Sequence, residues 1–401
     1  MQTSNSEFGY QPVKLYSNST LKLAVILKLL LLHQSINTVI LVKVLVIGSG
    51  LFGCCTAIEL ANAGFKVELI DAEKDIMQKA SRVNHNRIHL GYHYLRSVET
   101  AEQSIEGLLS FMFNYGHAVE NQFLNYYAIA KNDSKTTPDE FLSFCNKVGI
   151  GYDYEYPIND LFEKNMLSAC FKVPEPVFDY SLLKEMVKGN LVKSKINVSL
   201  NSTLTSLSKS ENGYSASYGN NTNNFDAVIN ASYANFNSIN AMLGIPLKKL
   251  LFEQVVIPEF EYQSSPFGLT VMDGEFCSVM PKGKRENEFL LYHVKDSVLK
   301  KIIATERPEF SKNLNNTYEN IYQNSSLFMP FLKNVKMKKI NEVTRVVHEN
   351  DDDARLTELF TYEGFDNYFA LLSGKITTCV QVALEVKHVL QGRDVNRRMK
   401  I

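Results

Sequence analysis

Residues 84–96, NHNRIHLGYHYLR, concentrate side chains that exchange protons and bind ligands. His85, His89 and His93 recur every four residues within this stretch. On a helix, this spacing would place three imidazoles on one face, as in a metal site. A glycine and two tyrosines disfavour a helix here, however, and the stretch contains no carboxylate. We therefore expect a role in binding or proton transfer, with a metal site as the alternative.

A second candidate site starts at residue 43, in KVLVIGSGLFGCCTAIELANAGFKVELID. The glycine pattern GxGxxG lies between an apolar run and a stretch of helical periodicity, and a second apolar run ends at an aspartate. The glycines permit a tight turn, a close backbone approach and tight packing of helix on strand, while the helix N-terminus favours phosphate. The aspartate can accept hydrogen bonds from a ribose. The residues predicted to bind a dinucleotide are Gly48, Ser49, Gly50, Leu51, Phe52, Gly53, Asp71 and Ala72.

The sequence after this fingerprint indicates whether the dinucleotide is FAD or NAD. A nicotinamide dehydrogenase would usually continue with further βα units, whereas this chain continues with DIMQKASRVNHNRIHLGYHYLRS. Fingerprint and continuation together resemble the FAD-dependent oxidoreductase family that includes D-amino-acid oxidase, sarcosine oxidase and glycine oxidase. Residues 88–94 are also similar to L-2-hydroxyglutarate oxidases of that superfamily. Leu95 departs from the pattern, since close relatives tend to place proline there, which concerns local geometry only.

The resemblance extends over roughly residues 42–395. Its later parts are FDAVINAS (225–232), TVMDGEF (270–276), LYHV (291–294) and LLSGKI (371–376). It implies FAD as the cofactor, with the flavin ring along the histidine–tyrosine segment. Further cofactor-binding residues implied in this way are Ser81, Asn84, Asn86, Arg87, Ile88, Asn230, Ala231, Ser232, Ser373, Gly374, Lys375 and Ile376.

Cations and a helix dipole beside a flavin would stabilise the negative charge of its reduced ring. Arg87 and His89 are expected to supply positive or proton-carrying groups, and the helix after Lys375 is expected to supply the dipole. A solvated lysine at the helix start is the alternative for Lys375. Covalent attachment of the flavin through a histidine is an alternative mode of binding.

We expect the protein to be an FAD-dependent oxidase or dehydrogenase that removes a hydride from a C–H beside a nitrogen or a hydroxyl of a small substrate. The residues expected at the substrate are His89, Tyr92, His93, Tyr292 and His293. Arg87 or Arg96 would bind a substrate carboxylate. Core packing is the alternative for the two tyrosines, and a hydrogen-bonded structural role is the alternative for the histidines. The alternative functions are an NAD-linked dehydrogenase and an FAD-binding protein without turnover, and the electron acceptor is not identified.

A chain of 401 residues is too long for one simple core, which predicts two domains. The expected fold class is α/β, with a Rossmann-like FAD-binding domain and a discontinuous, mainly antiparallel β substrate domain. The FAD-binding domain is expected from residues 42–110, 190–245 and 340–398. The substrate domain is expected from residues 111–189 and 246–339, after an N-terminal extension of residues 1–41.

Periodicity and turn residues predict the main elements around these sites. Helices are expected at residues 101–118, 139–148, 181–193 and 376–390. Strands are expected at residues 44–47, 67–70, 123–130, 196–207, 214–219, 225–232, 252–260, 266–273, 276–281 and 288–294. A tight hairpin is expected at Glu211-Asn212-Gly213.

The composition is that of an ordinary globular protein. The formal net charge of -1 provides no general attraction for nucleic acid or an anionic membrane, and six cysteines without CxxC spacing favour reduced thiols in the cytoplasm. Residues 21–32, LKLAVILKLLLL, are interrupted by two lysines and are shorter than the ~20 residues of a membrane span. We expect a helical extension there, with a peripheral membrane or partner helix and a signal sequence as alternatives.

Overall fold

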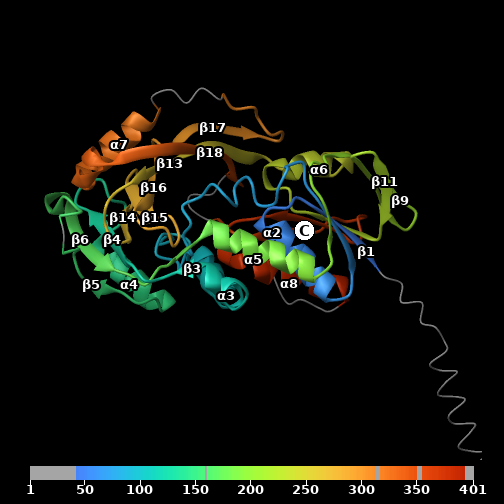
Figure 1. Cartoon of the computed structure of the whole chain (residues 1–401), viewed down its shortest axis with the longest axis horizontal. Helices are drawn as coiled ribbons and strands as arrows, with labels where there is room; N and C mark the ends of the chain where they lie inside the picture. The colour runs from blue at the N-terminus through green and yellow to red at the C-terminus, as the bar shows by residue number, and fades with distance from the viewer. Residues whose placement is uncertain (1–41, 159, 312–316, 350–354, 393–401) are drawn as a thin grey trace, which may run out of the picture. The chain divides into compact units, whose positions relative to one another are not determined.

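The computed structural model describes residues 42–158, 160–311, 317–349 and 355–392. Within this part of the chain, four β-sheets and the helices around them are built from segments far apart in the sequence (Figure 1). The apolar run at residues 21–32 lies outside the described residues. Among the residues that are described, no helix combines the length and the apolar character needed to cross a bilayer.

The first large sheet has six strands, and all neighbours are parallel except β19 and β20. In spatial order they are β19 (Glu358–Phe360), β20 (Tyr368–Leu372), β12 (Ala227–Asn230), β1 (Lys43–Ile47), β2 (Lys66–Ile70) and β8 (Asn197–Ser199). Strand β1 reads KVLVI, and its last four residues are buried. A continuous apolar run is what a parallel strand covered on both faces requires.

The side chains of β1 alternate between two hydrophobic cores. Val44 and Val46 pack with the helices on one face, and Leu45 and Ile47 pack with elements on the other. The helices of the first face are α2 (Leu51–Asn62), α3 (Val98–Tyr115), α5 (Tyr180–Lys193) and α8 (Cys379–Leu390). The second face packs against α6 (Phe236–Met242) and an antiparallel sheet of β9 (Leu204–Ser210), β10 (Gly213–Tyr218) and β11 (Asn221–Phe225).

The second large sheet has nine strands and is antiparallel except for the pair β4 and β14. Its strands are β4 (Leu124–Ala130), β5 (Asp153–Tyr154), β6 (Leu167–Lys172), β13 (Leu250–Glu261), β14 (Phe267–Met272), β15 (Cys277–Pro281), β16 (Glu288–His293), β17 (Val298–Ala304) and β18 (Lys336–His348). Helices α4 (Pro138–Val148) and α7 (Thr317–Phe328) pack against its buried side chains. Figure 1 shows the long strands β13 and β18 side by side, and they pair over most of their length.

The remaining elements are short connections between these layers. They comprise the two-stranded sheet of β3 (Val119–Glu120) and β7 (Val177–Phe178) and the 3-10 helices η1 (Gly116–Ala118), η2 (Lys164–Met166), η3 (Tyr233–Asn235), η4 (Pro330–Asn334) and η5 (Ile376–Thr378).

Most predicted elements are confirmed, and the differences have local causes. The helix predicted over 101–118 begins at Val98, because the Ser97 side chain caps it, and its last three residues form η1. The strand predicted over 225–232 is split between β11 and β12. The side chain of Asp226 lies at this break and accepts a hydrogen bond from the backbone N–H of Lys43 at 2.6 Å. The final helix, predicted from Ile376, begins at Cys379 after the 3-10 turn η5.

The mixed α/β fold with a sheet-rich second half agrees with the predicted class. The limits predicted for the two domains stay a prediction. Two of these limits, at residues 190 and 340, fall inside α5 and β18, which are continuous elements. Sequence patterns did not predict β6, β17 or β18.

Residues 84–96 form an irregular segment rather than a helix. A bridge between Arg87 and Val177 and the hydrogen bond from the N–H of Phe178 to the carbonyl of Asn86, at 2.8 Å, attach the segment to β7. The three histidines therefore do not share a helical face. No group of three or more metal-ligating side chains occurs among the described residues.

Candidate active site

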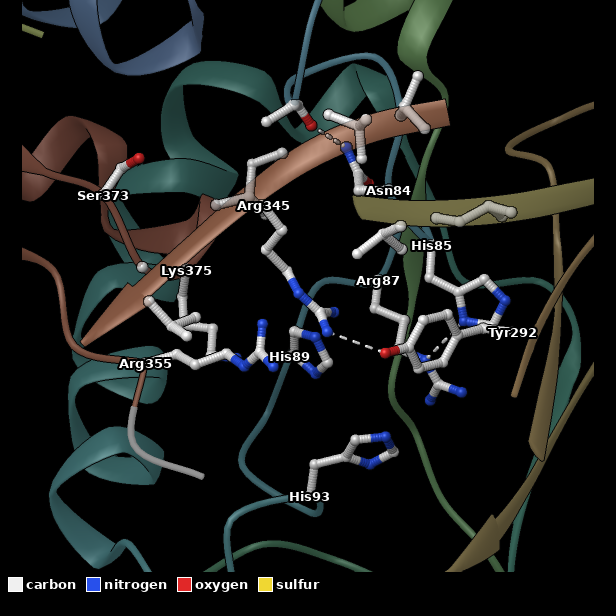
Figure 2. Close-up of a pocket in the computed structure, with 18 of the residues that line it drawn as sticks. Asn84, His85, Arg87, His89, His93, Tyr292, Arg345, Arg355, Ser373 and Lys375 are labelled. Carbon is white, nitrogen blue, oxygen red and sulfur yellow. Dashed lines mark hydrogen bonds between the residues drawn. The ribbon is translucent and has the colours of Figure 1, made fainter. Parts of the chain in front are cut away.

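A cavity of about 370 Å³ lies between the loops after the parallel strands and the nine-stranded sheet. This is the position at which open α/β sheets bind ligands. Four cationic side chains line it, namely Arg87, Arg345, Arg355 and Lys375, and its described lining contains no aspartate or glutamate. Figure 2 shows these side chains around His89, with Arg345 and Arg355 pointing toward the centre of the view.

The turn between β1 and α2 forms one end of this cavity. Gly48 has φ of 103°, and a Cβ there would lie 2.6 Å from the carbonyl oxygen of Ala231. Only glycine tolerates both the backbone angle and the contact. The N-cap residue Gly50 has no side chain that could cap α2. The first turn of α2, at Leu51 and Phe52, lines the cavity, so the positive end of the helix dipole lies there.

Asp71 and Ser81 flank this turn. Asp71 Oδ2 accepts a hydrogen bond from Ser49 Oγ at 2.8 Å, and its Oδ1 accepts one from the N–H of Glu73 at 2.8 Å. Ser81 Oγ accepts the N–H of Leu51 at 2.9 Å, which ties the 80–94 segment to the start of α2. Predicted residue Ala72 is exposed beside Asp71.

Arg87 is neutralised by a buried carboxylate. Its Nη1 donates to Glu175 Oε2 at 3.0 Å and to the Tyr127 hydroxyl at 2.8 Å, and its Nη2 donates to Thr270 Oγ1 at 2.5 Å. Burial opposes ionisation of Glu175, but a hydrogen bond from His89 and the charge of Arg87 outweigh it and lower the pKa of this carboxyl. Arg87 and Glu175 thus neutralise each other, and their contacts hold the segment 87–90 in place.

Burial keeps the three histidines of the segment uncharged at neutral pH. It lowers the pKa of His85 to about 3, with a contribution from Arg87, and the pKa of His89 to about 4, with a contribution from Lys375. The pKa of His93 is also lowered by burial. His85 Nε2 bonds the carbonyl of Leu290 at 2.9 Å, and His89 Nδ1 faces Glu175 Oε1 at 3.6 Å. His93 Nδ1 is buried without a hydrogen-bond partner among the described residues. An unpartnered ring nitrogen beside a cavity is available to a ligand.

Two arginines on the opposite wall differ in their partners. On β18, Arg345 Nε lies 2.6 Å from Glu253 Oε2, and its Nη2 donates to the Tyr292 hydroxyl at 3.0 Å (Figure 2). Arg355, by contrast, has no hydrogen-bond or ion-pair partner among the described residues. Burial, with the neighbouring charge of Arg345, lowers the pKa of Arg355. Among the described residues its guanidinium forms no direct ion pair, although the Glu253 carboxylate acts on it at longer range.

Lys375 is the fourth cationic residue of the lining and is only 5% exposed. Its Nζ donates a hydrogen bond to the Tyr94 hydroxyl. Burial lowers the pKa of Lys375 to about 7. The turn that carries it depends on Gly374, since a Cβ there would lie 1.9 Å from the carbonyl oxygen of Arg355.

The structure brings some of the residues expected at the substrate together and separates others. His89, His93 and Tyr292 line the cavity, whereas Tyr92 and His293 do not. The Tyr92 hydroxyl donates to the carbonyl of Gly151 within a hydrophobic cluster, and His293 Nδ1 lies 3.0 Å from Asp296 Oδ2. These surroundings favour the alternatives given above, core packing for Tyr92 and a hydrogen-bonded structural role for His293.

The residues expected at the cofactor divide in the same way. Those that line the cavity are Leu51, Phe52, Ser81, Asn84, Arg87, Ser373, Gly374, Lys375 and Ile376. Asn86, Ile88, Asn230, Ala231 and Ser232 do not line it. The turn from Gly48 to Gly53 forms one end of the cavity. Ile88 is fully buried in the core, and the Asn230 side chain bonds the carbonyl of Phe236 at 2.9 Å. Arg96, expected as a carboxylate ligand, pairs with Asp273 instead and lies outside the lining.

Sequence reasoning missed Arg345, Arg355, Glu175 and Tyr94. One signal was present, because Arg345 stands in the run Val-Thr-Arg-Val-Val, which is typical of a β-strand. An arginine within such a strand is a candidate for a buried or site-facing cation.

Comparison with known proteins identifies the family to which this chain is similar. Residues 43–312 match the family described as FAD dependent oxidoreductase. The FAD-dependent monooxygenase kojA of Aspergillus flavus is 29% identical over 255 residues, covering 60% of this chain and 58% of that protein. The FAD-dependent monooxygenase FPY4 of Fusarium mangiferae is 24% identical over 236 residues, covering 59% of this chain and 60% of that protein. The matches thus span less than two thirds of the length of these curated relatives.

Solved structures show the same fold. Glycine oxidase from Geobacillus kaustophilus has a TM-score of 0.69 at 13% identity, covering 89% of this chain and 97% of that one. L-alpha-glycerophosphate oxidase from Mycoplasma pneumoniae, with FAD bound, has a TM-score of 0.70 at 14% identity, covering 87% and 94%. At such identities the likeness concerns the fold.

Proposed function

Because this chain belongs to the FAD-dependent oxidoreductase family, whose cofactor is FAD, we propose that it oxidises a small carboxylate substrate at a C–H bond beside a nitrogen or an oxygen. FAD supplies the hydride acceptor when bound. The residues of the chain bind and orient the substrate, exclude water and manage its proton.

The cavity fits the cofactor in both shape and charge. The glycine turn and the uncapped N-terminus of α2 suit a diphosphate, and Asp71 at the end of β2 suits a ribose. Ser81, Asn84 and the turn 373–376 lie further along the same cavity. These residues would hold FAD, and this assignment removes the alternative of an NAD-linked dehydrogenase.

The observation that carries the substrate class is the guanidinium of Arg355. A buried cation without a partner is costly, and a carboxylate matches a guanidinium through two parallel hydrogen bonds. Arg345 is already neutralised by Glu253, so we assign the substrate carboxylate to Arg355. Tyr292, held by Arg345, would then border the bound substrate.

Neutral histidines suit the rest of the substrate. The unpartnered Nδ1 atom of His93 can donate to or accept from a hydroxyl or amino group. Apolar side chains of β13 and β18, among them Val255, Ile257 and Val343, line the same cavity and exclude water. The chemistry is therefore oxidation of a small hydroxy or amino acid.

A second candidate function follows from the two curated relatives, which are named FAD-dependent monooxygenases. The same experiment separates the candidates. The purified protein is mixed without oxygen with a panel of 2-hydroxy acids, amino acids and N-methyl amino acids, and separately with NADH or NADPH. A carboxylate compound that bleaches the flavin absorbance supports the proposal. Bleaching by the nicotinamide nucleotides alone supports the monooxygenase.

The role of Arg355 is tested by Arg355→Met against the same panel. We expect the dissociation constant of the reducing carboxylate to rise by roughly 10- to 100-fold, because a charged hydrogen bond contributes about 1.5–3 kcal/mol. The limiting bleaching rate should change much less. Arg307→Met, at an exposed arginine, is the matched control. Unchanged affinity in Arg355→Met would contradict the proposal.

A further inference from the structure

Lys375 combines burial with the absence of an acidic partner. Its side chain lines the cavity and forms no ion pair with a carboxylate among the described residues. Its polar partner is the Tyr94 hydroxyl, and its Nζ lies 4.0 Å from the centre of the Tyr94 ring. Lysine is almost never buried unless it is paired, so this position requires a physical explanation.

The backbone around Lys375 is held in one place by threonine side chains. Thr357 Oγ1 accepts the N–H of Gly374 at 2.9 Å, and Thr378 Oγ1 donates to the carbonyl of Lys375 at 2.7 Å. The two threonine hydroxyls also bond each other at 2.6 Å. Lys375 therefore enters the cavity from a rigid turn, as a reacting group must.

The groups that face Lys375 favour its neutral form. The 89–94 segment presents His89, His93 and the Tyr94 hydroxyl, and the opposite wall presents the cations Arg345 and Arg355. Glu175, behind His89, is already occupied by Arg87. Burial in surroundings of low polarity disfavours an ammonium ion and lowers the pKa of Lys375. A neutral amine at neutral pH is a competent base.

We infer that Lys375 accepts the proton that the hydroxyl or ammonium group of the substrate must lose during oxidation. This inference rests on the proposed function. The C–H bond breaks and its electron pair leaves as hydride to the flavin, the O–H or N–H bond breaks toward the Lys375 amine, and a C=O or C=N bond forms. The ammonium ion so produced donates to the Tyr94 oxygen. Tyr94 is a positioning residue in this scheme.

The first test measures binding, without turnover, using acetate as the probe. Acetate is titrated into the FAD-loaded protein between pH 6 and pH 9, and its binding is followed by the flavin spectrum. We expect wild-type affinity to rise roughly tenfold as the pH falls through 7, because protonated Lys375 adds a positive charge to the site. This rise should be absent in Lys375→Met and in Lys375→Arg, whose charge does not titrate in this range. His348→Gln, at another titratable residue of the lining, should retain it.

The second test measures the rate of anaerobic flavin bleaching by the compound that the panel identifies. Wild-type rates should fall below pH 7. In Lys375→Met this pH dependence should vanish, with a rate reduced about 10²- to 10⁴-fold, the usual contribution of a general base. Tyr94→Phe should shift the pH dependence to lower pH, since the ammonium ion loses its acceptor. Lys375→Arg tests the same point if Lys375→Met does not fold.

The outcomes separate this inference from the proposed function. Acetate binding that depends on Arg355 but keeps its pH dependence in both Lys375 variants would overturn the role of Lys375 alone. A bleaching rate within threefold of wild type in Lys375→Met would do the same. Acetate binding that is unaffected by Arg355→Met would instead overturn the carboxylate site itself.

Discussion

Arg87 and Arg355 enter the same cavity from opposite walls, yet their surroundings differ. Arg87 has a buried carboxylate at 3.0 Å and a tyrosine hydroxyl at 2.8 Å, whereas Arg355 has no such partner among the described residues. Arg355 and the turn of Lys375 are in backbone contact at Gly374, so two uncompensated basic residues are placed together. The comparison teaches that a charge neutralised within the protein organises the scaffold, and a charge left without a partner is reserved for a ligand.

The largest effect is expected from removing the negative charge of Glu175, which neutralises Arg87. Glu175→Gln should lower the free energy of unfolding by about 3–5 kcal/mol, because it leaves the buried charge of Arg87 unpaired. Urea unfolding of the FAD-saturated protein measures this. Glu211→Gln, at an exposed glutamate, should change stability by no more than about 0.5 kcal/mol. A loss below about 1 kcal/mol for Glu175→Gln would mean that Arg87 is solvated.

Arg345 is intermediate, since it is paired and also faces the cavity. Arg345→Met should cost about 2–3 kcal/mol, because Glu253 is 3% exposed and, among the described residues, would keep Lys301 at 3.7 Å and the more distant charge of Arg355. The double variant Arg345→Met/Glu253→Met should recover most of this loss in the same unfolding assay. If the double variant is no more stable than the single one, packing rather than charge determines the loss.

Lys375 should make the stability of the protein depend on pH. Burial lowers its pKa from the usual 10.5 of a lysine to about 7, so between these values the unfolded chain binds a proton that the folded protein does not. Stability should therefore rise with pH in this window, by about 2 kcal/mol between pH 7 and pH 9. Lys375→Met should lose this component of the rise, as unfolding at several pH values would show. An identical slope in wild type and variant would place the titrating group elsewhere.

The smallest effect on stability is expected at the uncompensated arginine. Arg355→Met should lower the free energy of unfolding by no more than about 0.5 kcal/mol, and should raise it if the cost of burying the charge dominates, because no direct ion pair among the described residues is lost. The same variant should weaken carboxylate binding strongly, and calorimetry would measure this as a higher dissociation constant for acetate. A loss of 2 kcal/mol or more would show that Arg355 has a partner within the protein.

Part of the fold could be predicted because its signals are contiguous. The glycine turn, the helix start and the two flanking strands occupy residues 43–71, and each depends on neighbours in the sequence. The helix predicted over 139–148 is likewise found as α4, which begins at Pro138 and carries a capping box of Thr137 and Glu140. β18 was not predicted because it begins with the sequence KMKK, and three lysines in four residues are not typical of a strand. Its long pairing with β13 compensates for that weak preference.

The candidate site was predicted only in part for a related reason. Of the residues expected at the substrate, His89, His93 and Tyr292 line the cavity, whereas Tyr92 and His293 have the same residue types and contact other parts of the protein. Residue type indicates what a side chain can do. Its direction is set by the packing of segments that the sequence does not place.

The sequence by itself determined the dinucleotide turn, because backbone angles and helix dipoles there depend on adjacent residues. Only the tertiary structure decided which basic groups of the cavity are neutralised. Glu175 reaches Arg87 across 88 residues of sequence, and Tyr94 reaches Lys375 across 281. Burial and charge pairing act through space, so their outcome depends on distances that exist only once the chain is folded.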